Sequence, residues 1–106
     1  MSGKQVDTRV LRAQAAAAGN ALDRFAKART ELTELAKVLA GDHWGSSAEA
    51  AGLRDVLLST LINRMAEVNQ LTAAALKVRD GLLETADDEE RTEEAVADLF
   101  RPGRIT

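Results

Sequence analysis

The sequence predicts an all-α fold, in which two long helices form an antiparallel hairpin that completes a four-helix bundle by dimerisation. Three observations support this prediction. The chain is rich in alanine and has a single proline and few aromatic residues, a composition typical of long helices. Two long stretches carry apolar residues at heptad spacing, and a short segment between them contains helix-ending and helix-starting residues. At 106 residues, the chain is one domain or less.

The first heptad stretch predicts a helix over residues 8–40, preceded by an N-terminal arm of residues 1–7. Asp7 is a suitable N-cap because its short side chain can accept a hydrogen bond from the first helical turn. Apolar residues then recur in steps of four and three, with one arginine among them, which indicates a packing seam. The seam comprises Leu11, Ala15, Ala18, Leu22, Phe25, Arg29, Leu32, Ala36 and Leu39.

Residues 41–47 predict the turn between the helices. Gly41 has the permissive backbone that ends helices, whereas Asp42, Ser46 and Ser47 are residue types that cap the next one. Trp44 is the only tryptophan, and we expect it to cover the end of the helix pair, where a partner could also contact it.

The second heptad stretch predicts a helix over residues 48–84. Its seam comprises Leu57, Leu61, Arg64, Val68, Leu71, Ala75, Val78 and Leu82, with further apolar residues on both flanks. The apolar sector spans at least about 160° of the helix, which is more than one neighbouring helix covers. A second helix pair, from another copy or a sister hairpin, would therefore complete the core. The predicted partner interface comprises Leu57, Leu58, Leu61, Met65, Val68, Leu76 and Leu83.

Residues 87–106 predict an acidic C-terminal tail that is partly helical or disordered. Asp87 to Glu90 is a run of four acids, and such runs are usually solvated. Val96, Leu99 and Phe100 nevertheless fall at helical spacing, so the tail can be helical to about Phe100.

The residues favour a protein that is not an enzyme and holds no cofactor or metal. The chain has no cysteine, and its single histidine, His43, lies in the turn, so neither a zinc site nor an oriented catalytic base is expected. A net charge of −3 argues against nucleic acid binding. No apolar run reaches the roughly 20 residues that span a bilayer, and the start lacks the apolar core of a signal peptide.

Four arginines, Arg29, Arg54, Arg64 and Arg79, project into the apolar sectors. They could form an anion pocket, as inward-pointing arginines do in all-helical chorismate mutases. Pairing with carboxylates across the helices, or setting the register of the bundle, is the favoured alternative because they are spread along the rod.

The chain resembles the WXG-type (ESAT-like) helical hairpins of type VII, or ESX, secretion. The resemblance is carried by the turn His43-Trp44-Gly45, by the opening from Val6 to Ala13, and by the ending from Ala95 to Phe100, which is similar to that of the ESX secretion-associated relatives. Glycine follows Trp44 directly here, and Ser46 occupies the usual glycine position. The family's export signal pairs a tyrosine with an acid four residues later; the matching positions are Leu83 and Asp87.

The resemblance implies a substrate, or the partner of a substrate, that leaves the cytoplasm without a cleavable signal peptide and is read as a folded dimer by a secretion motor ATPase. Because the chain has no tyrosine, it could travel with a partner that carries the complete signal. The alternatives are a cytoplasmic interaction module or chaperone that is not exported, a small anion-binding mutase, and an extended coiled-coil dimer without a hairpin.

Overall fold

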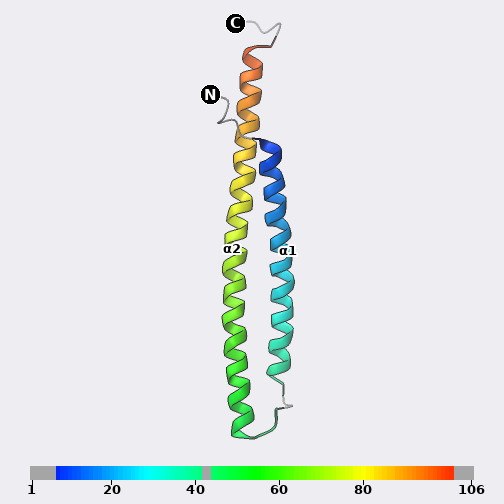
Figure 1. The fold of residues 1–106 in the computed structure, drawn as a ribbon, viewed down its shortest axis with the longest axis vertical. Coiled ribbons are helices and arrows are strands. Elements are labelled where there is room, and N and C mark those ends of the chain that lie inside the picture. The colour runs from blue at the N-terminus through cyan, green and yellow to red at the C-terminus, as the bar shows by residue number, and fades with distance from the viewer. Residues whose placement is uncertain (1–6, 42–43, 102–106) are drawn as a thin grey trace.

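The computed structural model describes residues 7–41 and 44–101, and this part of the chain consists of two helices. Helix α1 spans Thr8–Leu39 and helix α2 spans Ala48–Leu99. They lie side by side and run in opposite directions (Figure 1). The predicted all-α hairpin is confirmed, and the extended coiled coil without a hairpin is wrong. The predicted arm, apart from Asp7, and two turn residues, Asp42 and His43, lie outside the described residues.

Both helices begin at the predicted caps. The Asp7 carboxylate accepts a hydrogen bond from the Arg9 backbone N–H at 2.9 Å, and the Ser47 hydroxyl accepts one from the Ala50 N–H at 3.0 Å. Each cap satisfies a backbone donor that the first turn leaves without a helical partner.

Helix α1 ends without the glycine conformation that was predicted for Gly41. The helix ends at Leu39, and its C-cap Ala40 keeps right-handed backbone angles. Gly41 does not adopt a positive φ; among the described residues, that conformation occurs only at Gly45, with φ of 77°. The glycine whose backbone freedom the turn requires is therefore the one beside Trp44.

Helix α2 continues to Leu99 instead of ending at Glu84, so the predicted boundary was too early. Three of the four acids that suggested a solvated tail are paired with arginines, Asp88 with Arg91 and both Asp87 and Glu90 with Arg12, and Asp98 further along pairs with Arg101 at 2.7 Å. Pairs at i and i+3 support a helix, and the segment is rich in the helix formers glutamate and alanine. The expectation of helix to about Phe100 agrees with the structure, because Phe100 is the C-cap.

The two helices differ in length, and α2 extends past α1 at both ends. At 1.5 Å per residue, the 32 residues of α1 span about 48 Å and the 52 residues of α2 about 78 Å. The C-terminal turns of α2 project beyond the start of α1, and the connection runs beside the first turns of α2 (Figure 1). The molecule is consequently a rod of 85 × 24 × 18 Å.

The seam predicted for α1 contacts α2, except at Arg29, which is exposed beside the half-buried Ala28. The seam predicted for α2 is partly wrong. Leu57, Leu71 and Val78 are 36%, 51% and 54% exposed. The less exposed positions of α2 are again spaced by fours and threes: Leu58, Leu61, Met65, Val68, Thr72, Ala75, Arg79, Leu82 and Ala86.

The apolar sector of α2 is wide enough to form either seam. Both seams share Leu61, Val68, Ala75 and Leu82. At the alternate positions the structure uses the next residue along, for example Leu58 instead of Leu57. This rotation places Ala86, which is fully buried, level with Ala15, which is 2% exposed. It also brings Asp87 and Glu90 to Arg12. Close packing of two alanines and a cross-helix ion pair are thus obtained together.

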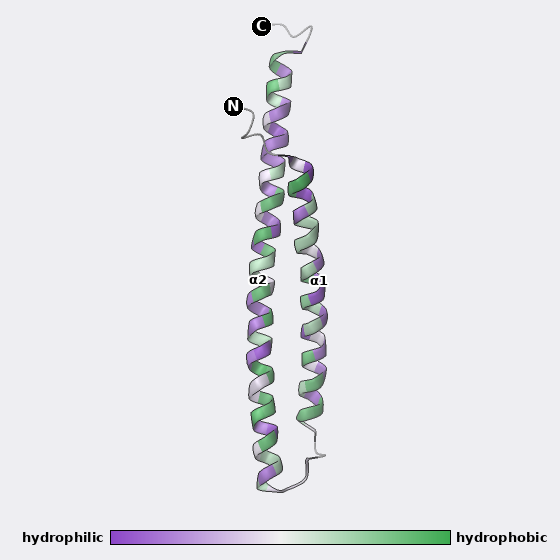
Figure 2. Cartoon of the chain, viewed as in Figure 1, coloured by the Kyte–Doolittle hydropathy of each residue, from purple (hydrophilic) through white to green (hydrophobic). Residues whose placement is uncertain are grey.

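The core is thin. Among the described residues, only Ala15, Leu39 and Ala86 are buried, and two of these are alanines. Hydrophobic residues recur along α1 and along α2 up to its acidic segment, which is mainly hydrophilic (Figure 2). One seam therefore supplies the packing energy of the single chain.

Replacing Leu39 by alanine should lower the free energy of unfolding by about 2–3 kcal/mol, because its side chain is only 6% exposed and its loss leaves a cavity beside the turn. The matched control is Ile62→Ala, where the side chain is 67% exposed; its effect should stay within about 0.5 kcal/mol. Urea denaturation at one protein concentration measures both, and equal effects would contradict a core that reaches Leu39.

Replacing Gly45 by alanine should destabilise the hairpin by roughly 1–2 kcal/mol, because a β-carbon disfavours its positive φ. The open space around Gly45 excludes a steric clash as the cause. Gly81→Ala, at an equally open position inside α2, should stabilise by roughly 0.5–1 kcal/mol. Thermal denaturation followed by circular dichroism would show opposite shifts; shifts of the same sign would refute this account of the turn.

Candidate partner-binding surface

Leu57, Leu71 and Val78 form an exposed apolar stripe along α2, with Arg64 between them. They are separated by multiples of seven residues, so they lie on one side of the helix, next to the seam. Leu35 of α1 is 47% exposed on the adjoining side. Sequence analysis placed all three apolar stripe residues in the seam of the second helix and only Leu57 also in the partner interface; the structure shows that all three are exposed.

A groove runs between the stripe and α1. Its walls are apolar and its rim carries charges: the lining residues are Ala28, Glu31, Leu32, Leu35, Arg64, Glu67, Val68 and Leu71. Its volume is about 390 Å³. Arg64 donates to Glu67 at 3.0 Å across one turn of α2, so the two rim charges form a pair. An apolar floor with a charged rim is the composition expected of a protein-binding surface.

The opposite flank of the hairpin has fewer exposed large apolar side chains and a smaller cavity. Ile62 and Leu76 are 67% and 39% exposed there, and Leu83 is half-buried. The cavity on this side is smaller, about 130 Å³, and is lined by Leu32, Ala36, Leu58, Leu61, Ile62 and Met65. The stripe side is therefore the stronger candidate for contact with another helix pair.

The predicted interface residues divide into two groups in the structure. Leu58, Leu61, Met65 and Val68 are half-buried in the seam with α1. Leu57 is exposed on the stripe side, whereas Leu76 lies on the opposite flank with Leu83. Their contact with a partner stays a prediction, and the structure shows that the first four also hold the hairpin together.

The turn residues Trp44 and Gly45 lie in the connection beside the start of α2. Trp44 is half-buried, and its indole Nε1 is shielded from solvent. Helix α1 ends short of the level at which α2 begins, and the connection that contains Trp44 spans this difference (Figure 1).

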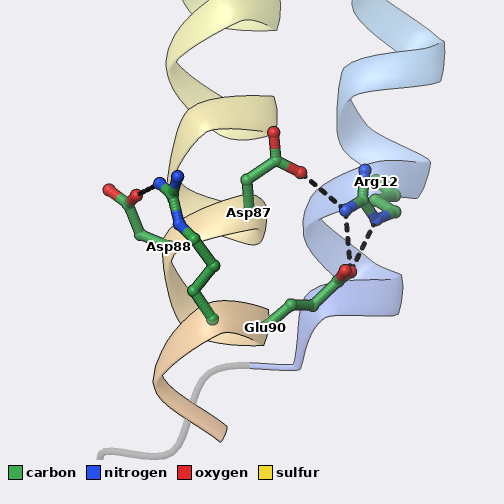
Figure 3. Close-up of polar contacts among 5 residues, drawn as sticks. Arg12, Asp87, Asp88 and Glu90 are labelled. Carbon is green, nitrogen blue, oxygen red and sulfur yellow. Dashed lines mark hydrogen bonds and ion pairs between the residues drawn. The ribbon is translucent and has the colours of Figure 1, made fainter. Parts of the chain in front are cut away.

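Arg12 joins the two helices in an ion-pair cluster that sequence reasoning missed (Figure 3). Its Nη2 lies 2.8 Å from the Asp87 carboxylate and 2.7 Å from that of Glu90, and its Nε donates to Glu90 at 2.9 Å. Charge-assisted bonds that share one guanidinium fix the register of the helices. Arg12 and Glu90 occupy equivalent flanking positions of the two heptads only in the observed seam of α2, so the predicted seam could not reveal the pair.

Hydrogen bonds to Glu90 and then to Asp87 raise the pKa of the Arg12 guanidinium above its usual value. A raised pKa stabilises the folded chain at every pH below the normal arginine pKa, and this contribution is lost only in strong alkali. The side chains remain 41–59% exposed, so dissolved salt screens the cluster.

Both positions of the predicted export signal lie inside α2. Leu83 is half-buried, and the Asp87 carboxylate accepts from Arg12. The structure therefore brings the predicted acid into the hairpin, close to α1, and not into a separate tail.

The four arginines of the possible anion pocket do not converge. Arg64 pairs with Glu67, Arg79 with Asp80 at 3.0 Å, and Arg54 with Asp55 at 3.9 Å. These pairs lie within α2, whereas pairing across the helices was expected. Arg29 is exposed on α1. A dicarboxylate substrate would need several of these guanidinium groups at one point, and they are distributed along the rod.

In the part of the chain that the structure describes, no group of three or more His, Cys, Asp or Glu side chains could hold a metal ion. Neither described helix combines the length and apolar character needed to cross a membrane. A scan against protein-family models and searches of curated proteins and of solved structures found no match for this chain.

Replacing Arg12 by glutamine should lower the melting temperature by a few degrees at low salt, and the loss should vanish as salt screens the pair. Arg9→Gln is the control, because Arg9 is 91% exposed and lies 3.6 Å from its local neighbour Asp7. Thermal denaturation across a salt series would measure both; an Arg12 effect that does not depend on salt would contradict an electrostatic contribution.

Proposed function

We propose that the chain is a non-enzymatic hairpin subunit that pairs with a second hairpin to form a four-helix bundle. The observation that carries the proposal is the exposed apolar stripe of Leu57, Leu71 and Val78 beside an apolar groove. Exposed apolar surface of this extent on a helix pair is typical of an interface.

The surface area supports the same proposal. The chain exposes 8253 Å², and its radius of gyration is 24.4 Å. A compact protein of 11.4 kDa would expose roughly 5,800 Å² and have a radius of gyration of about 13 Å. The excess is well above the roughly 800 Å² that each partner buries in a standard interface.

The biological role we propose is that of a type VII secretion substrate or of the partner of one. The support is the resemblance of the Trp44–Gly45 connection, and of the opening and ending of the chain, to WXG-type hairpins. A folded dimer that presents a tryptophan-containing connection beside acidic helix ends offers a composite surface that a motor ATPase could recognise. Export would then require no cleavable leader.

The second candidate is a hairpin interaction module or chaperone that stays in the cytoplasm. One observation favours it: Asp87, the acid in the possible signal, is paired with Arg12 at 2.8 Å. A carboxylate engaged in this way is less available to an export receptor, and the aromatic position is occupied by Leu83.

Co-purification with the product of the neighbouring gene, followed by native mass spectrometry, tests the pairing. The expected result is a complex of two hairpins, either two copies or one of each. A monomer at micromolar concentration, both alone and with the neighbour, would overturn the proposal.

Comparing culture supernatants of the native host with and without a working type VII system tests export. Loss of the protein from the medium in the secretion mutant is expected, with a cytoplasmic protein as the lysis control. Retention of the protein in both strains would favour the chaperone-like alternative.

A further inference from the structure

We propose that the hairpin on the stripe side is a second copy of this chain, with its α2 antiparallel to the first and the two-fold axis close to Arg64 and Glu67. This inference rests on the proposed pairing of hairpins and names the partner. A two-fold interface must be self-complementary, because the same residues meet from both copies. The surface of α2 beside the groove satisfies this condition.

The pattern along that side of α2 is apolar at both ends and charged in the middle. Leu53 and Leu57 lie toward the start, with exposures of 54% and 36%, and Leu71 and Val78 toward the end, with 51% and 54%. Arg64 and Glu67 occupy the centre and are 63% and 57% exposed at their side chains. Apolar residues thus lie on both sides of a central pair of opposite charges.

In an antiparallel pair of α2 helices, the positive charge of one copy lies opposite the negative charge of the other. When Arg64 of one helix lies opposite Glu67 of the other, the same alignment places Leu57 opposite Ala74 and Leu53 opposite Val78. Two equivalent Arg–Glu pairs then form at the centre, Leu71 lies opposite Thr60 next to them, and the apolar pairs follow toward both ends. A parallel pairing would instead set Arg64 against Arg64 and Glu67 against Glu67, and like charges at an interface oppose association.

Helix α1 leaves room for such a neighbour. On this side it presents the half-buried Ala21 and Ala28, whose small side chains allow another helix to approach closely, and Leu35, which forms the far wall of the groove. The apolar contacts would supply affinity, and the central pairs would set orientation. The groove of about 390 Å³ would be filled from the second copy.

A charge exchange tests the central contact. Arg64→Glu and Glu67→Arg should each weaken the homodimer by roughly tenfold in Kd, because each creates like-charge contacts between copies. Each also removes the pair within its own helix, so a mixture of the two variants provides the control. In a mixed dimer, the pair between positions 64 and 67 stays broken within each chain, but opposite charges face each other between the chains. Native mass spectrometry should therefore show mainly mixed dimers.

Single cysteines test the orientation, because the natural chain has none. A mixture of Leu57→Cys and Ala74→Cys chains should form a disulfide-linked mixed dimer under mild oxidation. Either variant alone should cross-link far less, since like positions are distant from each other in the antiparallel arrangement. Efficient self-linking of Leu57→Cys would indicate parallel pairing and overturn the proposal.

Two aspartate substitutions test which side of the hairpin contacts the second copy. Leu71→Asp, in the groove, should weaken the homodimer by roughly a hundredfold in Kd. Ile62→Asp, on the opposite flank and 67% exposed, should leave dimerisation unchanged while introducing the same side chain. Circular dichroism confirms that both variants are folded, and sedimentation gives their mass.

The outcomes separate this inference from the proposed function. If the chain alone is a monomer but forms a complex with a sister hairpin, the homodimer is overturned and the pairing of hairpins stands. If the homodimer forms but Ile62→Asp disrupts it, or mixing the charge variants fails to restore it, the stripe is not its interface. Loss of all pairing, with any hairpin, overturns both.

Discussion

The rest of the structure depends on a single line of contact between two helices. Each helix has one side against the other, so only three of the described residues, Ala15, Leu39 and Ala86, are buried. Small residues on this line let the helices approach closely but contribute little buried area. A rod of this kind retains far more surface than a compact protein of equal mass. The proposed pairing with another hairpin follows from this geometry.

Ion pairs stabilise the part of α2 that lies near and beyond the end of the apolar seam. The acidic segment of α2 would disfavour a helix through its own repulsion, but Arg12 draws Asp87 and Glu90 toward α1, and Arg91 and Arg101 pair with acids one turn away. The helix therefore continues past the start of α1. The acids remain partly exposed, so the segment keeps a negative surface that a cationic partner could contact.

The connection and the stripe bear on function in different ways. The resemblance to WXG-type hairpins falls on Trp44 and Gly45, which also have a structural role: Trp44 is half-buried, and Gly45 supplies the positive φ of the turn. The stripe has no comparable role within the chain, because its leucines and Val78 are exposed. Uncovered apolar residues without an internal role are the stronger reason to propose a partner.

The sequence by itself determined what is local. Asp7 and Ser47 marked the helix starts, the heptad spacing indicated the seam of α1, and composition excluded strands. Tertiary structure decided the rotation of α2, since Leu57 and Leu58 both belong to regular heptad series and only packing against α1 selects between them. It also decided the length of α2 and the role of Asp87, because Arg12 lies 75 residues away in the chain. Contacts between residues this distant in sequence depend on the register of two helices, which local patterns do not specify.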